Sequence, residues 1–543
     1  MELSHVRGGD QPPLPQETIG RALARAAASR GEREALVACE QDLRLTYAEL
    51  LEAVDEVARG LLARGVGRGD RVGIWSPNRA EWTLVQYATA RIGAILVTIN
   101  PAYRSSELRY ALDQSGCRTL IAARSFKSSD YVAILAEVRD QLPELTDVVW
   151  LDDPSWQALL DGGRDQDPAA VERAGEPLTA DDPINIQYTS GTTGFPKGAT
   201  LTHRNILGNG YLVGNGCRYG EQDRICVPVP FYHCFGMVMG NLAALAHGAC
   251  VVIPAQAFDP AATLRAAAAE RCTSLYGVPT MFIAMLADPS FDEHDLSTLR
   301  TGIMAGSPCP AEVMRQVIDR MHMGEVTICY GMTETSPVST QTAADDPLEQ
   351  RVGTVGRVHP HVEVKVVDPA TGETVPRGET GELCTRGYSV MRGYWNDPGK
   401  TAEAIDGDGW MHTGDLATID EQGYLRIVGR SKDMIIRGGE NVYPREIEEF
   451  LYTHPDVADV QVIGVPDERF GEEIMAWVIP RAGVALDGER IREFCRGTIA
   501  HYKVPRYVHV TDEFPMTVTG KVQKYLMREQ AIEQLGLGAT ANG

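Results

Sequence analysis

The sequence predicts an α/β protein with a large N-terminal domain of α/β subdomains plus a β-subdomain, and a small α/β domain at the C-terminus. Three observations support this class. Helical and strand-like patterns alternate to about residue 345, short glycine-punctuated strands fill residues 350–430, and a new α/β unit begins after Gly429. Such alternation is typical of parallel sheets covered by helices. We place the domains at residues 1–429 and 430–543.

The first elements can be assigned in order. Thr46 and Glu49 have the spacing of a helix capping box, and apolar residues with helical spacing follow them. Residues 71–75 form a predicted strand, and residues 77–78 open a second helix. The continuous apolar run at 94–99 is typical of a strand that is covered on both faces.

Later segments are assigned by the same rules. Met237–Ile253 reads as a buried helix followed by a buried strand, because it is too short and too polar to span a bilayer. The proline- and acid-containing stretch 161–185 reads as a surface connection. Val362–Val367 alternates as a strand does, and Pro444 has the position of a first helical residue.

Composition excludes several function classes. The 543 residues include 51 basic and 74 acidic ones, giving a formal charge of −23, so a global basic footprint for nucleic acid is absent. The N-terminus lacks the apolar core of a signal peptide, and we expect a cytoplasmic protein without a transmembrane segment. The 11 cysteines include no C-x-x-C pair, which favours reduced thiols over a disulfide framework and argues against zinc.

One loop stands out as a candidate for phosphate binding. Tyr188–Gly198 follows a strand-like segment and combines glycines, hydroxyls and a lysine. Glycines let backbone N–H groups wrap a phosphate, while hydroxyls and a lysine add donors and charge. The string does not fit the Walker A pattern. By composition alone, an ordinary flexible loop remains the alternative.

The same string resembles the signature of the adenylate-forming (AMP-binding) superfamily, which includes acyl-CoA synthetases. Further segments resemble the other motifs of that family, in the family's order over about residues 40–530. They are Tyr330–Thr335, Gly393–Trp395, Trp410–Asp415, Gly429–Asp433 with Gly438–Asn441, and Pro515–Lys521.

The resemblance implies two half-reactions. A carboxylate first attacks the α-phosphorus of ATP, with Mg²⁺ as cofactor, to give an acyl-adenylate and pyrophosphate. A thiol, usually that of CoA, then displaces AMP. The small-molecule substrates implied are therefore a fatty acid, ATP and CoA, and a homodimer is compatible with the sequence.

The resemblance of the motifs implies roles for individual residues. Lys521 would orient the carboxylate and offset developing charge, and Thr333 would contact the α-phosphate. Glu334 and Thr193 would hold Mg²⁺, although a helix-capping acid is the alternative for Glu334. The implied ATP-binding residues are Thr189, Ser190, Gly191, Thr192, Thr193, Gly194, Phe195, Pro196, Lys197, Tyr330, Asp415, Arg430 and Lys521.

The resemblance also implies that the C-terminal domain is mobile. Lys432 lies at the family's hinge position, so the residues after it would rotate between the half-reactions. Gly438, Gly439 and Glu440 would then approach CoA. The alternative for Lys432 is an exposed linker charge.

Two segments resemble the walls of the family's acyl pocket. His233 would lie beside the carboxylate or gate the tunnel and is counted with the catalytic residues, although a lone histidine is more often structural. The full predicted pocket is His233, Phe235, Met237, Gly306, Ser307, Gly331 and Met332. The apolar ones are equally compatible with core packing.

These walls carry no obvious basic side chain for a second carboxylate, so an apolar monoacid is favoured. The motif combination looks most like medium-chain acyl-CoA synthetases of the acyl-CoA synthetase family member 2 type. We therefore expect a ligase that converts a medium- or long-chain fatty acid into acyl-CoA, AMP and pyrophosphate. An acyl-AMP ligase that loads an acyl carrier protein is the alternative, and a nucleotide-binding protein without catalysis is a further one.

Overall fold

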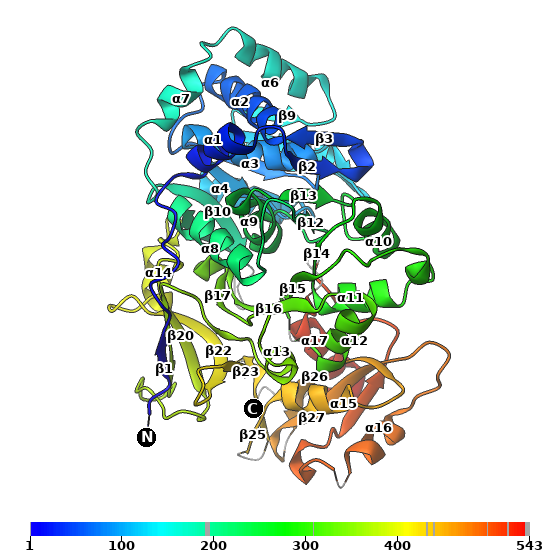
Figure 1. The fold of residues 1–543 in the computed structure, drawn as a ribbon. Helices are drawn as coiled ribbons and strands as arrows, with labels where there is room; N and C mark the ends of the chain where they lie inside the picture. Colours follow the sequence, from blue (N-terminus) through cyan, green and yellow to red (C-terminus); the bar gives the residue numbers. More distant parts are fainter. Residues whose placement is uncertain are drawn as a thin grey trace.

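The fold consists of sheet-and-helix layers above and a smaller C-terminal unit below (Figure 1). The computed structural model describes residues 2–189, 196–307, 309–430, 433–437, 440–467, 469–496, 498–517 and 521–537. Over these residues the α/β class predicted from the sequence is confirmed.

The first sheet has the order β21-β11-β10-β5-β4-β6-β9. Its inner strands are parallel, and β11 and β21 are antiparallel at one edge. The residues of β5 are all buried, as the unbroken apolar run predicted. The strands are β4 (Arg71–Trp75), β5 (Ile95–Thr98), β6 (Thr119–Ala122), β9 (Asp147–Trp150), β10 (Pro183–Thr189), β11 (Lys197–Thr202) and β21 (Gly393–Tyr394).

The second sheet has the order β18-β17-β16-β15-β14-β12-β13-β2-β3. Its centre is parallel, and its outer strands β3, β17 and β18 are antiparallel. The strands are β2 (Glu34–Ala38), β3 (Leu43–Thr46), β12 (Arg224–Cys226), β13 (Cys250–Ile253), β14 (Ser274–Gly277), β15 (Thr301–Ala305), β16 (Glu325–Gly331), β17 (Val338–Gln341) and β18 (Arg357–Val358).

Helices cover both sheets, and α2 shows how local sequence defines them. Its capping box is present: Glu49 accepts the Thr46 N–H at 2.8 Å, and its apolar face is buried. The helices of this region are α1 (Ile19–Arg30), α2 (Tyr47–Ala63), α3 (Ala80–Ile92), α4 (Ser105–Ser115), α5 (Tyr131–Val138), α6 (Pro154–Arg164), α7 (Ala170–Gly175), α8 (His203–Gly216), α9 (Ala243–His247), α10 (Pro260–Ala269), α11 (Pro279–Leu286), α12 (Ala311–Arg320) and α13 (Leu348–Gly353).

An antiparallel sheet, coloured yellow in Figure 1, confirms the predicted β-subdomain. Its order is β1-β19-β20-β22-β23, so the N-terminal strand β1, dark blue in Figure 1, joins strands that come more than 350 residues later in the chain. The elements are β1 (His5–Arg7), β19 (Val362–Val367), β20 (Gly381–Gly387), β22 (Met411–Ile419), β23 (Leu425–Arg430) and the flanking helix α14 (Pro398–Ala404).

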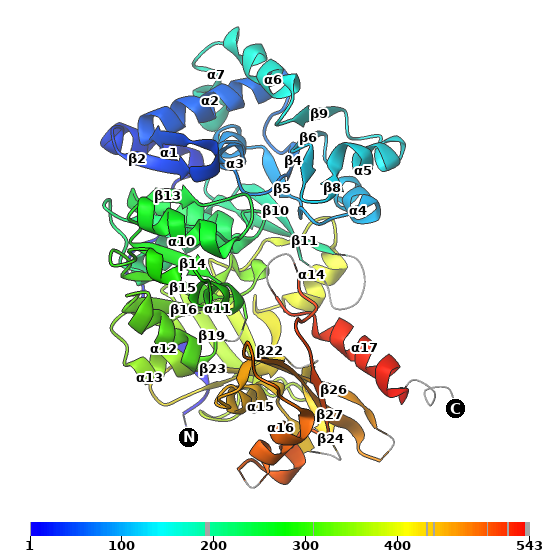
Figure 2. The same ribbon diagram turned by 90° about the vertical axis from the view of Figure 1, so that its right-hand side faces the viewer.

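The C-terminal unit has its own sheet, in the order β25-β24-β27-β26 with β28 beside β27. Pro444 is the first residue of its first helix, as predicted. Figure 2 shows α17 at the side of this unit. The elements are β24 (Ile435–Arg437), β25 (Glu440–Val442), β26 (Val457–Asp467), β27 (Gly471–Pro480), β28 (Tyr507–Val510), α15 (Pro444–Leu451), α16 (Gly488–Cys495) and α17 (Lys524–Leu535).

Two segments differ from the sequence expectation. The buried helix expected within Met237–Ile253 begins as a π-helix, η3 (Phe235–Leu242), before it continues as α9. Residues 161–185 are not a plain connection, because the end of α6, the short helix α7 and the start of β10 fall within them. Both differences come from elements too short or too irregular to leave a clear periodic pattern.

Candidate active site

The predicted phosphate loop joins two hydrogen-bonded strands. β10 ends at Thr189 and β11 begins at Lys197, and these two residues face each other in the antiparallel register. Ser190, Gly191, Thr192, Thr193, Gly194 and Phe195 lie outside the described residues. Pro196 is half-buried at the return of the loop, and the Lys197 ammonium lies 4.5 Å from the ring centre of Tyr394. The strand pair therefore fixes both ends of the loop.

Glu334 lies beside the mouth of this loop. It belongs to a single turn of 3₁₀-helix, Thr333–Thr335, directly after β16, and it is buried. Its Oε1 accepts hydrogen bonds from the Thr189 hydroxyl at 3.2 Å and from the Tyr394 hydroxyl at 2.9 Å. Mg²⁺ prefers hard carboxylate and hydroxyl oxygens, so Glu334 and Thr189 offer a fitting donor set.

Asp415 is held from two sides. Arg430 faces it across β22 and β23, and the guanidinium donates to Asp415 Oδ1 at 3.1 Å. The Tyr330 hydroxyl donates to Oδ2 at 2.6 Å, and burial together with this carboxylate raises the pKa of Tyr330. Each carboxylate oxygen has two lone pairs, so one remains on each for a ribose diol.

Lys521 reaches this centre from the C-terminal unit. Its backbone N–H donates to the Thr517 hydroxyl and its carbonyl accepts the Thr517 N–H. Loss of water and the charge of Arg430 lower the pKa of Lys521, and the carboxylates Asp415 and Glu334 oppose this shift. The ammonium group thus acts within the field of Glu334 and Asp415 from the N-terminal domain and of Arg430 at the domain boundary.

The predicted pocket wall at Gly306 also borders Lys521, because a Cβ on Gly306 would lie 3.9 Å from Lys521 Cε. His233 belongs to the same neighbourhood. Burial and the charge of Lys521 lower the pKa of His233 to about 3, so its ring is neutral at physiological pH. Its Nδ1 accepts the Phe235 N–H at 3.2 Å, which leaves the ring proton on Nε2.

Gln187 was missed by sequence reasoning, yet it connects three parts of the site. Its side-chain oxygen accepts from the Thr333 hydroxyl at 3.2 Å, from the Cys234 N–H at 3.2 Å and from the Cys234 thiol at 2.9 Å. Its amide nitrogen is buried and has no hydrogen-bond partner among the described residues. Buried donors of this kind are rare unless a ligand satisfies them. A lone glutamine in a strand carries no sequence signal for this role.

The predicted CoA and hinge residues can be placed only in part. Lys432, Gly438 and Gly439 lie outside the described residues, and Glu440 is the first residue of β25. Within the described chain, no helix is long and apolar enough to cross a membrane.

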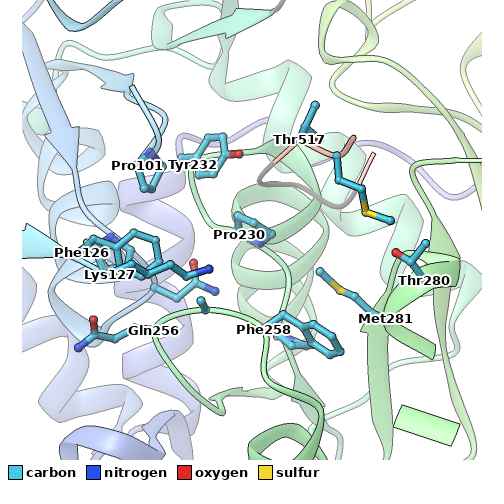
Figure 3. A pocket seen from close by; sticks show the side chains of 15 residues that line it. Pro101, Phe126, Lys127, Pro230, Tyr232, Gln256, Phe258, Thr280, Met281 and Thr517 are labelled. Carbon is cyan, nitrogen blue, oxygen red and sulfur yellow. The ribbon is translucent and has the colours of Figure 1, made fainter. Parts of the chain in front are cut away.

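A cavity of about 360 Å³ opens between the two domains (Figure 3). Lys127 and Gln256 lie on one side of it, and Thr280 and Thr517 lie on the other. The lining residues are Pro77, Asn78, Pro101, Phe126, Lys127, Pro228, Pro230, Tyr232, Gln256, Ala257, Phe258, Thr280, Met281, Met516 and Thr517.

This cavity and the pocket predicted from the sequence have no lining residue in common, although Tyr232 adjoins His233 in the chain. Phe235 and Met237 are buried in the core, and the Phe235 ring stacks on Tyr276 at 5.6 Å. Ser307 and Met332 are partly buried, whereas Gly331 is exposed.

Known families and proteins are similar to this chain over most of its length. A family model described as AMP-binding enzyme matches residues 23–395, and one described as AMP-binding enzyme C-terminal domain matches residues 446–521. The chain is 49% identical to YngI of Bacillus subtilis over 97% of this chain and 99% of that protein. It is 44% identical to the human medium-chain acyl-CoA ligase ACSF2, named as mitochondrial, over 98% of this chain and 91% of that protein.

Among solved structures, the anthranilate CoA ligase AuaEII in complex with anthranoyl-AMP superposes with a TM-score of 0.87. The two sequences are 28% identical, and the match covers 96% of this chain and 99% of the other.

Proposed function

Because the chain belongs to the AMP-binding enzyme family, an adenylate-forming group with acyl-CoA ligases among its members, we propose that it activates a medium- or long-chain fatty acid with ATP and transfers the acyl group to CoA. The observation that carries the proposal is the position of Lys521. It comes from the C-terminal unit and acts electrostatically on Glu334 and Asp415 of the N-terminal domain and on Arg430 at the domain boundary.

In the first half-reaction, a carboxylate oxygen forms a bond to the α-phosphorus, the bond to the β-phosphate oxygen breaks, and pyrophosphate leaves. Asp415 would hold the ribose diol through its remaining lone pairs. Lys521 would hold the carboxylate against the α-phosphate, which offsets charge that develops in the transition state. The Gln187 amide, which is buried and has no partner among the described residues, would donate to the α-phosphate.

Mg²⁺ would be held by Glu334 and the Thr189 hydroxyl, with Tyr394 orienting the carboxylate. When bound, the ion neutralises phosphate charge. The predicted ligand Thr193 remains a proposal, as do the other residues of the phosphate loop.

In the second half-reaction, the CoA thiol loses its proton to solvent, its sulfur forms a bond to the acyl carbon, and AMP leaves with the electron pair of the carbon–oxygen bond that breaks. Lys521 is then no longer required. We propose that the chain after the boundary at residues 429–430 rotates about Lys432 and brings Gly438, Gly439 and Glu440 to the thiol. The proposed hinge follows β23, which ends at Arg430 and is the last strand of the β-subdomain sheet.

The cavity between the domains supports CoA as the acceptor. It is lined mainly by apolar and proline side chains, with Lys127 as a cation on one side and Thr517 of the C-terminal unit on the other. An apolar channel with a cation at one side suits a pantetheine arm that carries phosphates at its far end. Lys127→Ala should raise the KM for CoA several-fold and leave acid-dependent pyrophosphate release unchanged. A changed preference for acid chain length would assign the cavity to the acyl group instead.

The proposal is tested by incubating the protein with MgATP and single acids from acetate to stearate, with and without CoA, and measuring pyrophosphate and acyl-CoA. Pyrophosphate and acyl-CoA that both depend on a medium- or long-chain acid support it. Pyrophosphate without acyl-CoA, together with acylation of an added carrier protein, would favour the carrier-protein ligase. No acid-dependent pyrophosphate would overturn the enzymatic assignment.

The cytoplasm remains our predicted location, although the ACSF2 relatives are named as mitochondrial. Fractionation of the producing cells would distinguish the two. A homodimer is likewise a proposal, which sedimentation equilibrium would test.

A further inference from the structure

Three potential metal ligands meet on one face of the β-subdomain, outside the groups that act in the proposed reaction. They are Glu382 and Cys384 on β20 and His412 on β22, and their ligand atoms all lie within 4.8 Å of one another. His412 Nδ1 is 3.0 Å from Glu382 Oε2 and 3.5 Å from Cys384 Sγ.

The strand register explains why these residues meet. Side chains two positions apart on a strand point to the same face, so Glu382 and Cys384 share a face of β20. Cys384 is paired directly with His412 across the antiparallel ladder. Cross-strand partners have Cβ atoms roughly 5 Å apart, which is close enough for both side chains to reach one ion. The ladder has a register shift at this point, because Glu382 pairs with Leu416 while Cys384 pairs with His412, so the three residues meet beside an irregularity of β22.

The spacing of the atoms suits a tetrahedral ion. Zinc bonds of about 2.3 Å to sulfur and about 2.0–2.2 Å to nitrogen or oxygen place ligand atoms roughly 3.3–3.6 Å apart. The Sγ–Nδ1 separation of 3.5 Å lies in this range, and the Nδ1–Oε2 separation of 3.0 Å needs only a small opening.

A further carboxylate, that of Asp406, lies near the other ring nitrogen of His412. Asp406 Oδ2 lies 3.7 Å from His412 Nε2, on the side of the ring opposite to Glu382. Histidines that bind metals usually donate their other ring N–H to such a carboxylate, which fixes the ring and its tautomer. Asp406 is itself oriented by the N–H groups of Asp408 and Trp410, which donate to its Oδ1 at 2.9 Å each.

The local charges also favour a dication. Glu382 and Asp406 carry two negative charges, Lys365, across from Cys384 on β19, carries one positive charge, and the thiolate that forms when Cys384 binds an ion adds a third negative charge. A divalent ion would therefore make the group neutral. Arg386 is also close, but it is paired with Glu363.

We infer that Glu382, Cys384 and His412 form a binding site for one divalent ion of the zinc type, with Asp406 as the carboxylate that orients His412. On binding, the Cys384 thiol releases its proton to solvent, and the ring proton of His412 moves from Nδ1 to Nε2, toward Asp406. Because the ion must displace the thiol proton, it binds more tightly as the pH rises.

The site is coupled to the nucleotide site through the backbone. Glu382 Oε1 accepts the Gly414 N–H at 3.1 Å, one residue before Asp415. The sequence rule for zinc missed this site because the ligands are separated by 28 positions and come together only through sheet pairing.

The test uses the full-length protein, stripped with a chelator and reduced with a phosphine. Co²⁺ should bind at one equivalent and give a thiolate-to-cobalt charge-transfer band in the near ultraviolet, which Zn²⁺ displaces and Mg²⁺ does not. Cys384→Ser should abolish the band. Asp406→Asn should weaken Co²⁺ binding by about 10- to 100-fold.

Two further variants keep the result interpretable. His412→Ala changes a partly exposed side chain, so it should fold and should also weaken binding. Cys39→Ser is the matched control, because Cys39 is more exposed than the buried Cys384 and would capture adventitious cobalt first. Absence of the band, a band that survives Cys384→Ser, or a band that is lost in Cys39→Ser would overturn the inference.

Discussion

The Tyr330 hydroxyl donates a 2.6 Å hydrogen bond to Asp415 Oδ2, while Arg430 holds Oδ1 of the same carboxylate. Asp415 therefore meets the nucleotide in a fixed orientation. A hydrogen bond to a charged group contributes about 1.5–3 kcal/mol. We expect Tyr330→Phe to raise the KM for ATP by roughly tenfold with a smaller change in kcat, as measured by pyrophosphate release.

Tyr424 provides a matched control for this prediction. Its hydroxyl donates to Asp346 at the same distance of 2.6 Å, in a pair that is separate from the site. Tyr424→Phe should leave the KM for ATP unchanged. An equal rise in both variants would mean that Tyr330 acts through stability and not through Asp415.

Lys521 should be needed for one half-reaction only. Removing one preorganised donor typically lowers the rate by about 10²–10³, so Lys521→Ala should lose adenylation by that factor. Thioester formation from supplied acyl-adenylate should remain largely intact. Lys503→Ala, which removes a lysine of the same domain paired with Glu446, should affect neither step. Equal losses in both steps of Lys521→Ala would refute the assignment.

The protonation state of Lys521 should determine how adenylation depends on pH. The pKa of this lysine is lowered below its ordinary value of 10.5, mainly by burial and then by Arg430. The protonated form is the active one, so adenylation should persist below that pKa and be lost as the pH rises through it. Acid-dependent exchange between ATP and pyrophosphate, measured without CoA, reports this step alone.

Lys521→Arg is the control for the profile, because arginine stays charged throughout this range. The variant should catalyse adenylation more slowly, but its loss of adenylation at alkaline pH should occur at a higher pH. If adenylation declined at the same pH in Lys521→Arg as in the unchanged protein, the decline would belong to a group other than Lys521.

Acid sensitivity of the fold should follow from buried histidines. Burial lowers the pKa of His203 and His233 to about 3 and that of His359 to about 4. The unfolded chain takes up protons near pH 6.5, whereas the folded chain does not, so stability should fall as the pH drops from about 6.5 to 4. Each histidine contributes about 1.4 kcal/mol per pH unit in this window. Asp459, whose pKa burial raises to about 6, has the opposite sign and offsets part of the loss.

The slope of stability against pH, obtained from urea unfolding, tests this account. His359→Asn should reduce the slope even if it lowers stability overall, whereas a change at the exposed His501 should leave it unchanged. An unaltered slope in His359→Asn would contradict the assigned protonation state.

The sequence predicted the features that depend on local strings. The capping box of Thr46 and Glu49, the buried strand β5 and the β-subdomain follow from periodicity and turn residues, and the structure confirms them. The π-helix at Phe235–Leu242 could not be foreseen. Gly236 packs against the Pro230 carbonyl there, with only 2.5 Å from an added Cβ to that oxygen, and this contact is tertiary.

In the candidate site, too, some residues could be predicted from local motifs, whereas others are brought in by tertiary contacts. Motif strings named Glu334, Asp415 and Lys521, and the structure places the three in one electrostatic neighbourhood. Gln187 belongs to the site because its side chain, on strand β10, accepts hydrogen bonds from Thr333 and Cys234. No local pattern in the sequence encodes these tertiary contacts.

The most direct test of the central claim is the fate of oxygen in a single turnover with a fatty acid labelled with oxygen-18 in its carboxylate. If the carboxylate attacks the α-phosphorus, one labelled oxygen must appear in AMP after transfer to CoA, and mass spectrometry of AMP should show it. Unlabelled AMP, or label in pyrophosphate or inorganic phosphate, would contradict an acyl-adenylate intermediate and the role assigned here to Lys521.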